Sequence, residues 1–493
     1  MIEEHLEDER IVLLDGQTGM TFRQIHERTA QYCAVFRRMK LQRGDRVLVL
    51  SDDLMETVMI LLACIADGMI FVSVNPKLDQ ESKEYIIGDC KPALIVEALD
   101  GYACRGEGID LCELMAERER CQEDTLVYIL YTSGTEGKPK GVMASQRQIL
   151  FCSTAINRRL CNTTEDRILC CLPLSFDYGL YQIFLAFLSG ARLCLALGDV
   201  IQRIPYLLRH WEITAFPTIP SVANIMMKTG MLREGDYPKL RYITFTGEIL
   251  QVSLIRSLEE RFPGIRVIPM YGLTECKRVS VMPEGREDKV RAGSCGLPLD
   301  GVRVWLEKVD PNSGIGELVV EGENVMEGYW GIPNDSGATF SLNQETGKRR
   351  LHTGDIFRID EEGFLYFCGR ENGIIKVWGH RISGAWIENI IRAVEGVREA
   401  AVMSAADVDA GEVPVLFLYA SEEVNEEHIR SRMKELPAYL QRYRLFMTRE
   451  PLPKNPNGKI DRKRLRETAE SWVNEFGGKR EFEIMSIMCG GLE

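Results

Sequence analysis

Short apolar runs alternate with helical patterns in the first part of the chain, from about Ile11 to Val96. The apolar runs have the length of buried strands and span residues 47–50, 70–74 and 93–96. Between them apolar residues recur at helical spacing, most clearly over Thr21–Met39, where Thr21 is suited to cap the first turn. Strands that alternate with helices in this way predict a largely parallel sheet covered by helices.

The same alternation returns further along the chain and then gives way to a different pattern. Strand-like runs span residues 167–172, 191–197, 215–217 and 240–244. From Gly301 to Tyr366 the runs are shorter, alternate with polar residues and are punctuated by glycines, which is typical of antiparallel β-structure. The predicted fold class is therefore α/β, with a large N-terminal domain of helix-covered sheets and a β-rich subdomain.

The last part of the chain predicts a separate, small α+β domain. The turn signal Glu371-Asn372-Gly373 marks its start. Helices are expected over residues 385–393 and 425–434, and strands near 400–402 and 413–419. We therefore predict an N-terminal domain at residues 1–371 and a C-terminal domain at 372–470, followed by a weakly patterned tail at 471–493.

Charge and composition exclude several classes of function. A net charge of −13 argues against a nucleic-acid binder, whose surface would be basic. The most apolar stretch, Met59–Val74, is interrupted by Asp67 and Gly68, which indicates a buried helix and a strand and no membrane span. The chain opens on acidic and polar residues, and its 15 cysteines include no C-x-x-C pair. We therefore expect reduced thiols, a cytoplasmic protein, and neither a nucleic acid nor a membrane as partner.

Residues 131–141, with the sequence YTSGTEGKPKG, are the most informative stretch of the chain. Glycines let the backbone approach an anion closely, hydroxyl groups donate to phosphate oxygens, and lysines neutralise charge. The spacing is not that of the Walker loop, because Pro139 follows Lys138 where that loop has Ser or Thr. The stretch predicts a triphosphate-binding loop, and the alternative is a flexible surface turn.

Four further signals follow at wide spacing. Residues 271–275, YGLTE, place an aromatic ring, a hydroxyl and a carboxylate on one turn, a set that can pack on a base, bond to a phosphate and bind Mg²⁺. Asp355, in a Thr-Gly-Asp sequence, can accept hydrogen bonds from ribose hydroxyls. Arg370 offers a guanidinium at the predicted domain boundary, and Lys459 lies in a predicted loop from which a cation can reach a cleft. Each signal alone has an ordinary structural explanation. Chance does not explain why all of them occur together in this order.

With these motifs the sequence resembles the AMP-forming adenylating superfamily of acyl-CoA synthetases, adenylation domains of nonribosomal peptide synthetases and luciferase-type enzymes. The resemblance extends from about Thr21 to Arg466 and rests on YTSGTEGKPKG, YGLTE, GEL with GY, HTGD, GR…IK…GHRI and NPNGKIDR. It implies a large N-terminal domain and a small mobile C-terminal domain that moves between two half-reactions. It also implies ATP and Mg²⁺, an acyl-AMP intermediate, and a thiol of coenzyme A or of carrier-bound phosphopantetheine as acceptor.

The resemblance implies a role for each motif residue. The ATP-binding residues would be Thr132, Ser133, Gly134, Thr135, Gly137 and Lys138 at the β- and γ-phosphates, Gly247, Glu248, Ile249 and Tyr271 around the adenine, Asp355 and Arg370 at the ribose, and also Gly272. Thr274 would contact the α-phosphate and Glu275 would bind Mg²⁺. Lys459 would bridge the substrate carboxylate and the α-phosphate.

Two positions depart from the pattern of the superfamily. Glu136 stands in the phosphate loop where Thr or Ser is commoner, and we expect its side chain to turn outward. The hinge position, usually Asp, is Asn372, which keeps the turn propensity and loses the charge. We expect rotation of the C-terminal domain to survive, with altered energetics.

The substrate pocket is predicted around Phe176 and Asp177. Amino-acid-activating members of the superfamily carry Phe-Asp, with the Asp paired to the substrate ammonium, whereas many acyl- and aryl-CoA synthetases carry an aromatic residue or His followed by an apolar residue. Asp177 fits the first pattern, and the alternative is that it caps a helix. The leading prediction is therefore an amino acid loaded onto the phosphopantetheine of a carrier protein in trans. The alternative is an acyl- or aryl-CoA ligase that acts on another small carboxylic acid and uses free coenzyme A.

The same comparison of motifs places further residues around the pocket, namely Tyr178, Tyr181, Thr244, Thr246, Met270, Arg278 and Val279. If Arg278 points inward, an acidic or otherwise polar group on the substrate is expected; if the register slips by one residue, Arg278 lies on the surface. A hypothesis of another class is a non-catalytic homologue that senses nucleotide or acts as a scaffold. The presence of Lys459, Glu275 and Asp355 argues against it.

Overall fold

The structure is a computed structural model, which describes residues 8–16, 18–97, 124–132, 138–196, 201–232, 237–311, 313–333, 339–370, 374–377, 380–407, 411–434, 436, 440–454, 460–462 and 464–469. Only the backbone is described for Ile374, Lys376, His380, Arg381 and Gly411. The chain divides into two compact units, the first made of residues 1–304, 320–352 and 363–365, and the second of residues 305–319, 353–362 and 366–493. The domain boundaries expected at residues 371 and 470 stay predictions.

A nine-stranded sheet in the first unit contains the parallel strands that the sequence predicts. Its order is β14-β13-β12-β11-β10-β8-β9-β1-β2, and the strands from β12 to β1 in this order are parallel. The bounds are β1 Leu13–Asp15, β2 Thr18–Met20, β8 Arg167–Cys170, β9 Arg192–Leu195, β10 Ala215–Thr218, β11 Tyr242–Phe245, β12 Arg266–Tyr271, β13 Ser280–Val281 and β14 Leu297–Pro298. The core strands are almost wholly buried, as expected of a parallel sheet with helices on its faces.

Helices connect these strands. They are α5 Gln146–Leu160, α6 Asp177–Ser189, α7 Ile204–His210, α8 Pro220–Lys228, α9 Val252–Arg261 and α10 Glu287–Arg291. Helix α6 is apolar around most of its circumference and is buried along nearly its whole length, which places it in the interior of the unit. A helix in that position can present polar side chains to a buried cavity.

A second, six-stranded sheet of the first unit has the order β17-β7-β6-β4-β3-β5. Its bounds are β3 Arg46–Val49, β4 Ile70–Ser73, β5 Leu94–Val96, β6 Leu126–Thr132, β7 Lys140–Ser145 and β17 Gly328–Tyr329. Strands β5, β3, β4 and β6 are parallel, whereas β6, β7 and β17 pair antiparallel. The pairing therefore brings the chain near residue 329 beside the strand that follows the predicted phosphate loop.

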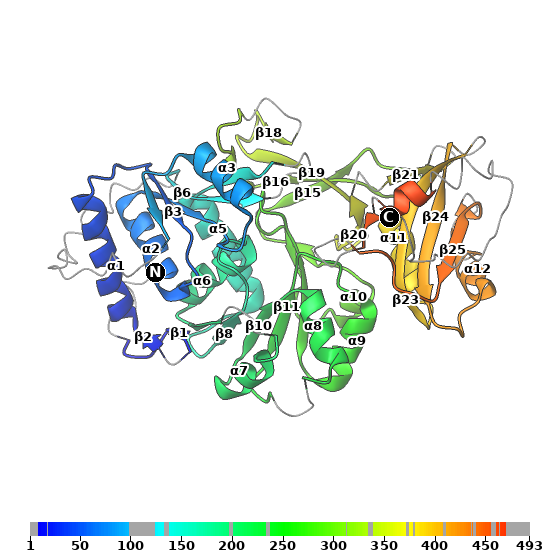
Figure 1. Cartoon of the computed structure of the whole chain (residues 1–493), viewed down its shortest axis with the longest axis horizontal. Coiled ribbons are helices and arrows are strands. Elements are labelled where there is room, and N and C mark those ends of the chain that lie inside the picture. The colour runs from blue at the N-terminus through cyan, green and yellow to red at the C-terminus, as the bar shows by residue number, and fades with distance from the viewer. Residues whose placement is uncertain are drawn as a thin grey trace. The chain divides into compact units, whose positions relative to one another are not determined.

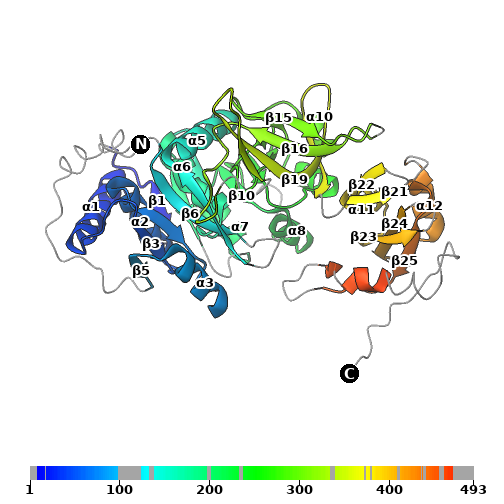
Figure 2. The ribbon, with the colours of Figure 1, turned by 90° about the horizontal axis from the view of Figure 1, so that it is seen from above.

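Three helices belong to the N-terminal part of this region: α1 Phe22–Arg38, α2 Leu54–Asp67 and α3 Gln80–Cys90. Figures 1 and 2 show α1 and α2 side by side. The predicted cap is confirmed, because the Thr21 side chain accepts from the backbone of Gln24 and the Gln24 side chain accepts from the backbone of Thr21. The apolar stretch 59–74 is the end of α2 and strand β4, separated by Gly68 in the left-handed conformation. None of the described helices combines the length and the apolar character needed to cross a membrane.

Strands follow over this part of the chain, and all but one of the five are short, as the pattern of residues 301–366 predicts. A five-stranded sheet has the order β15-β16-β19-β18, and β20 also pairs with β19. The bounds are β15 Arg303–Glu307, β16 Gly316–Glu321, β18 Phe340–Leu342, β19 Arg349–Ile359 and β20 Leu365–Arg370. The pair β18 and β19 is antiparallel, in agreement with the prediction.

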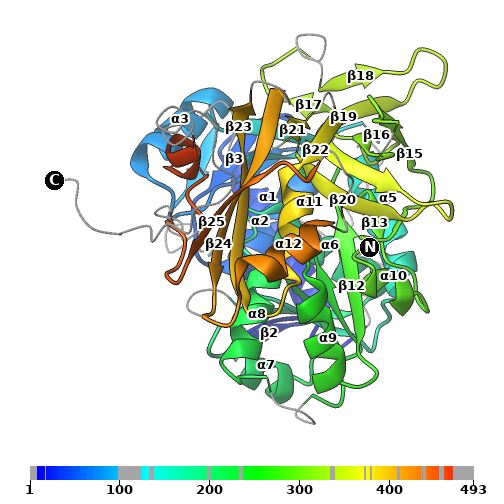
Figure 3. The ribbon, with the colours of Figure 1, turned by 90° about the vertical axis from the view of Figure 1, so that its right-hand side faces the viewer.

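The C-terminal part of the second unit is a five-stranded sheet with helices on it. Its order is β22-β21-β24-β23, with β25 on β24. The bounds are β21 Ile374–Val377, β22 His380–Ser383, α11 Gly384–Arg392, β23 Val397–Asp407, β24 Gly411–Ala420, α12 Glu426–Lys434 and β25 Arg444–Thr448. Alternate residues of β23 face opposite sides, so Ala400 and Val402 pack with α11 and α12, and Ala401 and Met403 pack on the other face. Figure 3 shows α11 and α12 on the same side of β23 and β24.

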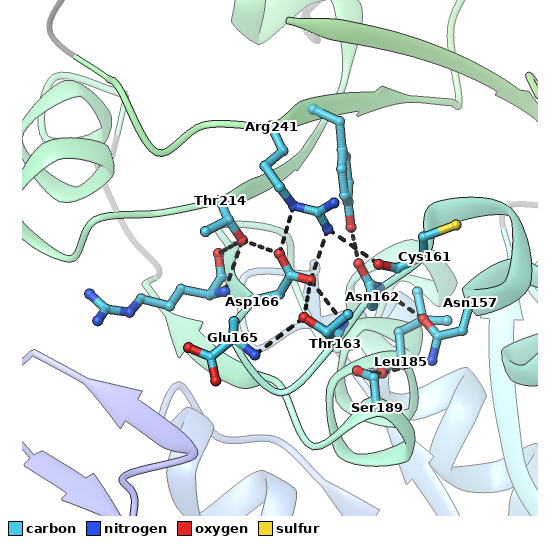
Figure 4. Close-up of polar contacts among 12 residues, drawn as sticks. Asn157, Cys161, Asn162, Thr163, Glu165, Asp166, Leu185, Ser189, Thr214 and Arg241 are labelled. Atoms are coloured by element: carbon cyan, nitrogen blue, oxygen red, sulfur yellow. Dashed lines mark hydrogen bonds and ion pairs between the residues drawn. The ribbon is translucent and has the colours of Figure 1, made fainter. Parts of the chain in front are cut away.

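A buried carboxylate holds together the amino ends of three adjacent parallel strands (Figure 4). Asp166, directly before β8, accepts hydrogen bonds from Arg241 at 3.0 and 2.8 Å and from the Thr214 hydroxyl at 2.6 Å. Thr214 directly precedes β10 and Arg241 directly precedes β11. Because Asp166 is nearly inaccessible to solvent, these contacts satisfy a charge that would otherwise be costly to bury. The amino ends of the strands are thereby fixed, and their carboxyl ends lead into loops.

Candidate active site

The carboxyl ends of the parallel strands carry most of the predicted site residues of the first unit. The chain after β8 leads into α6, which has Phe176 at its N-cap and Asp177 in its first turn. Residues 246–249 follow β11, and residues 272–275 follow β12. Parallel strands end at one edge of their sheet, and ligands of open α/β sheets bind at that edge. The topology therefore brings residues predicted for the acid and for the nucleotide to the same edge.

The turn after β11 is fixed by Glu248. Its carboxylate accepts from the backbone N–H and the hydroxyl of Ser221, the second residue of α8, at 2.9 Å each. Gly247 has a φ of +84°, in the left-handed region that favours glycine. Ile249 is exposed on the same turn. This geometry gives an ordered backbone turn with an apolar side chain, and its contact with adenine stays a prediction.

The turn after β12 folds closely back on itself. A Cβ atom on Gly272 would lie 2.0 Å from the carbonyl oxygen of Lys277, so only glycine fits there. The backbone N–H of Val279 donates to the carbonyl of Tyr271 at 2.9 Å, which closes the turn. The YGLTE motif is thereby tied to Lys277 and Arg278, which lie at the end of the same turn.

Glu275, the predicted Mg²⁺ ligand, is held by Tyr329. The Tyr329 hydroxyl donates to Glu275 Oε1 at 2.9 Å, and burial, reinforced by this carboxylate, raises the pKa of Tyr329, so the hydroxyl stays protonated. The ring of Tyr329 also lies 5.5 Å from the ammonium of Lys140, in strand β7. Mg²⁺ in nucleotide sites is typically held by one or two carboxylates together with substrate phosphates. One oriented, partly exposed carboxylate beside the strand that leaves the phosphate loop fits that requirement.

The predicted phosphate loop is described only at its ends. Thr132 and Lys140 are paired across the antiparallel strands β6 and β7, which enter and leave the loop. Residues 133–137, and with them Ser133, Gly134, Thr135 and Gly137, lie outside the described residues. The ammonium of Lys138 lies 5.5 Å from the ring of Tyr85.

Three charged side chains are buried together beside the start of α6. The ammonium of Lys277 donates to Asp177 Oδ2 at 3.0 Å and to the Asp177 carbonyl at 2.9 Å. Arg278 Nη1 donates to the hydroxyl of Thr246 at 2.7 Å. The exposed fractions of Asp177, Lys277 and Arg278 are 7%, 1% and 2%. Asp177 is not the cap of α6, because Phe176 occupies that position, and its carboxylate binds a lysine of the same chain.

Aromatic rings surround the two cations. The Lys277 ammonium lies 4.1 Å from the ring centroid of Tyr181, and the Arg278 guanidinium lies 5.3 Å from that of Tyr178. Burial lowers the pKa of Lys277 to about 8, against the opposing effect of Asp177, so the ammonium is mainly charged at neutral pH. Burial also raises the pKa of Cys152 to about 12 and raises the pKa of Tyr128, Tyr178 and Tyr181. These neighbours are therefore neutral.

Lys277 and Arg278 line a small cavity between α5, α6 and the parallel strands. It is lined by Ile156, Leu160, Tyr178, Tyr181, Gln182, Leu185, Pro217, Tyr242, Thr244, Met270, Lys277 and Arg278. Five of these residues were predicted to surround the substrate: Tyr178, Tyr181, Thr244, Met270 and Arg278. The structure therefore brings them together and turns Arg278 inward, and their contact with a substrate stays a prediction. The open space within the cavity is about that of one water molecule.

Asp355 and Arg370 lie in the second unit, on the neighbouring strands β19 and β20. Arg370 Nε and Asp355 Oδ1 are 3.2 Å apart, with the carboxylate buried and the guanidinium mostly exposed. The Thr353 hydroxyl donates to the Leu318 carbonyl at 2.7 Å and accepts from the Asp355 backbone N–H at 3.1 Å. Asp355 is thus a hydrogen-bond acceptor and Arg370 a donor, both held on one sheet. Their contact with ribose stays a prediction. Lys459 and Asn372 lie outside the described residues.

Sequence reasoning missed two residues of this site. Lys277 pairs with a residue 100 positions away, and Tyr329 contacts Glu275 from 54 positions away. The available signal for Lys277 was a Lys-Arg pair directly before the apolar run that becomes β13. Tyr329 belongs to the GY motif of the resemblance, but nothing in that motif connects its hydroxyl to Glu275.

Two protein-family models match most of this chain. The family model of AMP-binding enzymes matches residues 3–330, and the model of their C-terminal domain matches residues 386–459. The chain is 29% identical to 4-coumarate–CoA ligase 3 of Oryza sativa subsp. japonica, over 93% of this chain and 89% of the relative. It is 28% identical to tyrocidine synthase 2 of Brevibacillus parabrevis, over 93% of this chain but only 13% of that much longer protein.

A solved structure shares the fold of most of this chain. The o-succinylbenzoate CoA synthetase of Bacillus subtilis, in complex with its acyl-adenylate intermediate, superposes with a TM-score of 0.74 at 26% identity, covering 94% of this chain and 97% of the other. The predicted fold class is therefore confirmed. The predicted class of enzyme, an AMP-forming ligase of carboxylic acids and thiols that uses ATP and Mg²⁺, is confirmed by the family match. Since that match covers residues 3–330, this chain belongs to the family of AMP-binding enzymes.

Proposed function

We propose that this chain activates a small carboxylic acid with ATP and transfers the acyl group to the thiol of phosphopantetheine. In the first step a carboxylate oxygen attacks the α-phosphorus, the bond to the β-phosphate oxygen breaks, and acyl-AMP and pyrophosphate form. In the second step the thiolate sulfur attacks the acyl carbon, and AMP leaves with the bonding electrons of the mixed anhydride.

A single turn, residues 271–278, carries this proposal because it supports both reactants of the first step. Glu275 fits Mg²⁺ and is oriented by Tyr329. Lys277 and Arg278, at the end of the turn, line the cavity predicted for the acid. Because Gly272 locks the turn against Lys277, the nucleotide end and the acid end are held in a fixed relation.

Other residues of the chain would complete the first step. Thr274, beside Glu275, would donate to the α-phosphate, and Asp355 would accept from the ribose hydroxyls. Lys459 would neutralise charge that develops as pyrophosphate leaves, an effect of the order of 3 kcal/mol on the barrier. Mg²⁺, when bound, would shield the phosphate charges from the approaching carboxylate.

Two more specific versions of this function differ in the acid that is activated and in the thiol that accepts the acyl group. An amino acid loaded onto a carrier protein requires Asp177 to pair with the substrate ammonium. In the structure that carboxylate already binds Lys277 at 3.0 Å, which supports an acid without an amine. Free coenzyme A and a carrier-bound phosphopantetheine present the same thiol, so the acceptor is a question for experiment.

A panel of carboxylic acids, with and without an α-amino group, tests the proposal. Pyrophosphate release should depend on ATP, Mg²⁺ and one class of acid. The acyl product should then be captured by coenzyme A or by a phosphopantetheinylated carrier protein, each supplied alone. Intact ATP binding without turnover of any acid would instead support the non-catalytic scaffold.

A further inference from the structure

The buried charges beside α6 do not balance. Lys277 and Arg278 contribute two positive charges, and Asp177 contributes one negative charge. Among the described residues that line the cavity, Lys277 and Arg278 are the charged ones, and the tyrosines remain protonated because burial raises their pKa. A buried charge without a counter-charge is costly. The cavity therefore has a net attraction for one anion.

Asp177 is poorly placed to receive a substrate amine. The Lys277 ammonium binds both its carboxylate and its carbonyl, so two hydrogen bonds hold the lysine in place. A second ammonium at Asp177 would have to displace Lys277 or share one carboxylate with it, and the two like charges would repel. Lys277 therefore occupies the position that a substrate ammonium would need.

Arg278 retains unused hydrogen-bonding capacity toward an anion. One N–H binds the Thr246 hydroxyl at 2.7 Å. Its Nε atom is fully buried and has no hydrogen-bond partner in the part of the chain that the structure describes. A guanidinium matches the two oxygens of a carboxylate geometrically, and such pairs are among the strongest hydrogen-bonded contacts in proteins. The open space beside Arg278 is about that of one water molecule, so it admits at most the terminal oxygen of a carboxylate and excludes a long chain or an aromatic ring.

We propose that this cavity selects a short dicarboxylic acid. One carboxylate is adenylated, and the other pairs with Arg278. Lys277 acts as a positioning residue that keeps Asp177 from binding an amine. This inference rests on the proposed adenylation of a carboxylic acid and narrows it to one substrate class.

The unmodified enzyme provides the first test. Dicarboxylic acids of three to five carbons are compared with their half-amides, which keep the shape and remove one charge, and with amino acids of similar size, by ATP-dependent pyrophosphate release. The kcat/KM for at least one diacid should exceed that of its half-amide on the order of 100-fold, because the half-amide leaves the guanidinium unpaired. If a half-amide or an amino acid has a kcat/KM equal to or above that of every diacid, the inference is overturned and the proposed adenylation stays intact. Absence of turnover with every acid would overturn both.

Two variants then assign the selectivity to residues. In Arg278→Gln the kcat/KM for the diacid should exceed that for its half-amide by no more than about tenfold, because the positive charge that pairs with the second carboxylate is gone. Arg291→Gln removes an exposed arginine that pairs with Glu259 and should leave the ratio unchanged. Retention of the full ratio in Arg278→Gln would contradict the proposal.

Lys277→Met tests the role of the lysine. It frees the Asp177 carboxylate, so the kcat/KM for amino acids relative to the diacid should rise at least tenfold, an effect that a merely structural lysine would not produce. No rise in a folded Lys277→Met variant would refute the role of Lys277. If Lys277→Met does not fold, the Arg278→Gln ratio and the wild-type panel still decide the substrate class.

Discussion

At the scale of single residues, Tyr329 connects two parts of the candidate site. Its hydroxyl binds Glu275, and its ring lies beside Lys140, which follows the phosphate loop. The ring also packs edge-on against Phe340, with the centroids 5.2 Å apart. Phenylalanine at this position would keep the packing and remove only the hydroxyl, so the role of that one group can be measured.

Tyr329→Phe should lower the apparent affinity of the enzyme for Mg²⁺. Without the hydroxyl, Glu275 loses the contact that orients it, and the concentration of Mg²⁺ giving half-maximal pyrophosphate exchange should rise about 3- to 10-fold, the effect typical of a lost orienting hydrogen bond. The matched control is Tyr366→Phe, whose hydroxyl binds Asp360 at 3.0 Å and has no predicted role in catalysis. An unchanged Mg²⁺ titration in Tyr329→Phe would argue against Glu275 as the ligand.

At the scale of elements, two glycines have opposite roles. Gly88 lies in the exposed part of α3, and a Cβ atom added there meets nothing within 4 Å. Gly272 lies in the turn after β12, where a Cβ atom would collide with the Lys277 backbone. One glycine weakens a helix, and the other is required by the turn that carries the candidate site.

Gly88→Ala should therefore stabilise the protein by about 0.5–1 kcal/mol, because alanine restricts the unfolded chain and favours a helix. Gly272→Ala should destabilise it by about 2 kcal/mol or more, because the backbone of residues 277 and 278 must move. Urea unfolding of both variants measures these changes. Equal stability of Gly272→Ala and the wild type would show that the turn relaxes without strain.

At the scale of the whole molecule, the predicted site residues are distributed over both units. The acid cavity and Glu275 belong to the first unit, whereas Asp355 and Arg370 belong to the second. Lys459 is predicted in the C-terminal domain. In the superfamily that the sequence resembles, the C-terminal domain moves between two half-reactions. A lysine of that domain should consequently serve one half-reaction and not the other.

Lys459→Ala tests this division. Formation of acyl-AMP should fall by ~10²-fold or more, since one preorganised cation is worth on the order of 3 kcal/mol of barrier. Thiolation from supplied acyl-AMP and the melting temperature should change little. Lys454→Ala is the control, because Lys454 lies nearby in sequence and pairs with Glu399 at 2.9 Å. Near-normal pyrophosphate exchange in Lys459→Ala would refute its assigned role.

The sequence alone determined the parts of this protein that are local. Apolar residues that recur every 2 or 3.6 positions located most strands and helices to within a few residues, as for Thr21 and α1. This works because a strand or helix that buries one face needs apolar residues at the positions that lie on that face. Motifs such as YGLTE indicated the nucleotide chemistry, because their functional groups lie within one turn. The interrupted apolar stretch 59–74 likewise indicated a helix followed by a strand, which are the end of α2 and β4, because the interruption at Asp67 and Gly68 is local.

Tertiary structure decided what depends on distant residues. The sequence alone allowed Asp177 to be paired with a substrate ammonium, because it does not show that Lys277 is near. The fold brings Lys277 to Asp177 across 100 positions of the chain. The inward direction of Arg278 followed from the pairing of β12 with β13, which fixes the register of the residues between them. Such contacts leave no period and no spacing in the sequence, because the chain between two partners can have any length once each partner is anchored in its own strand or helix.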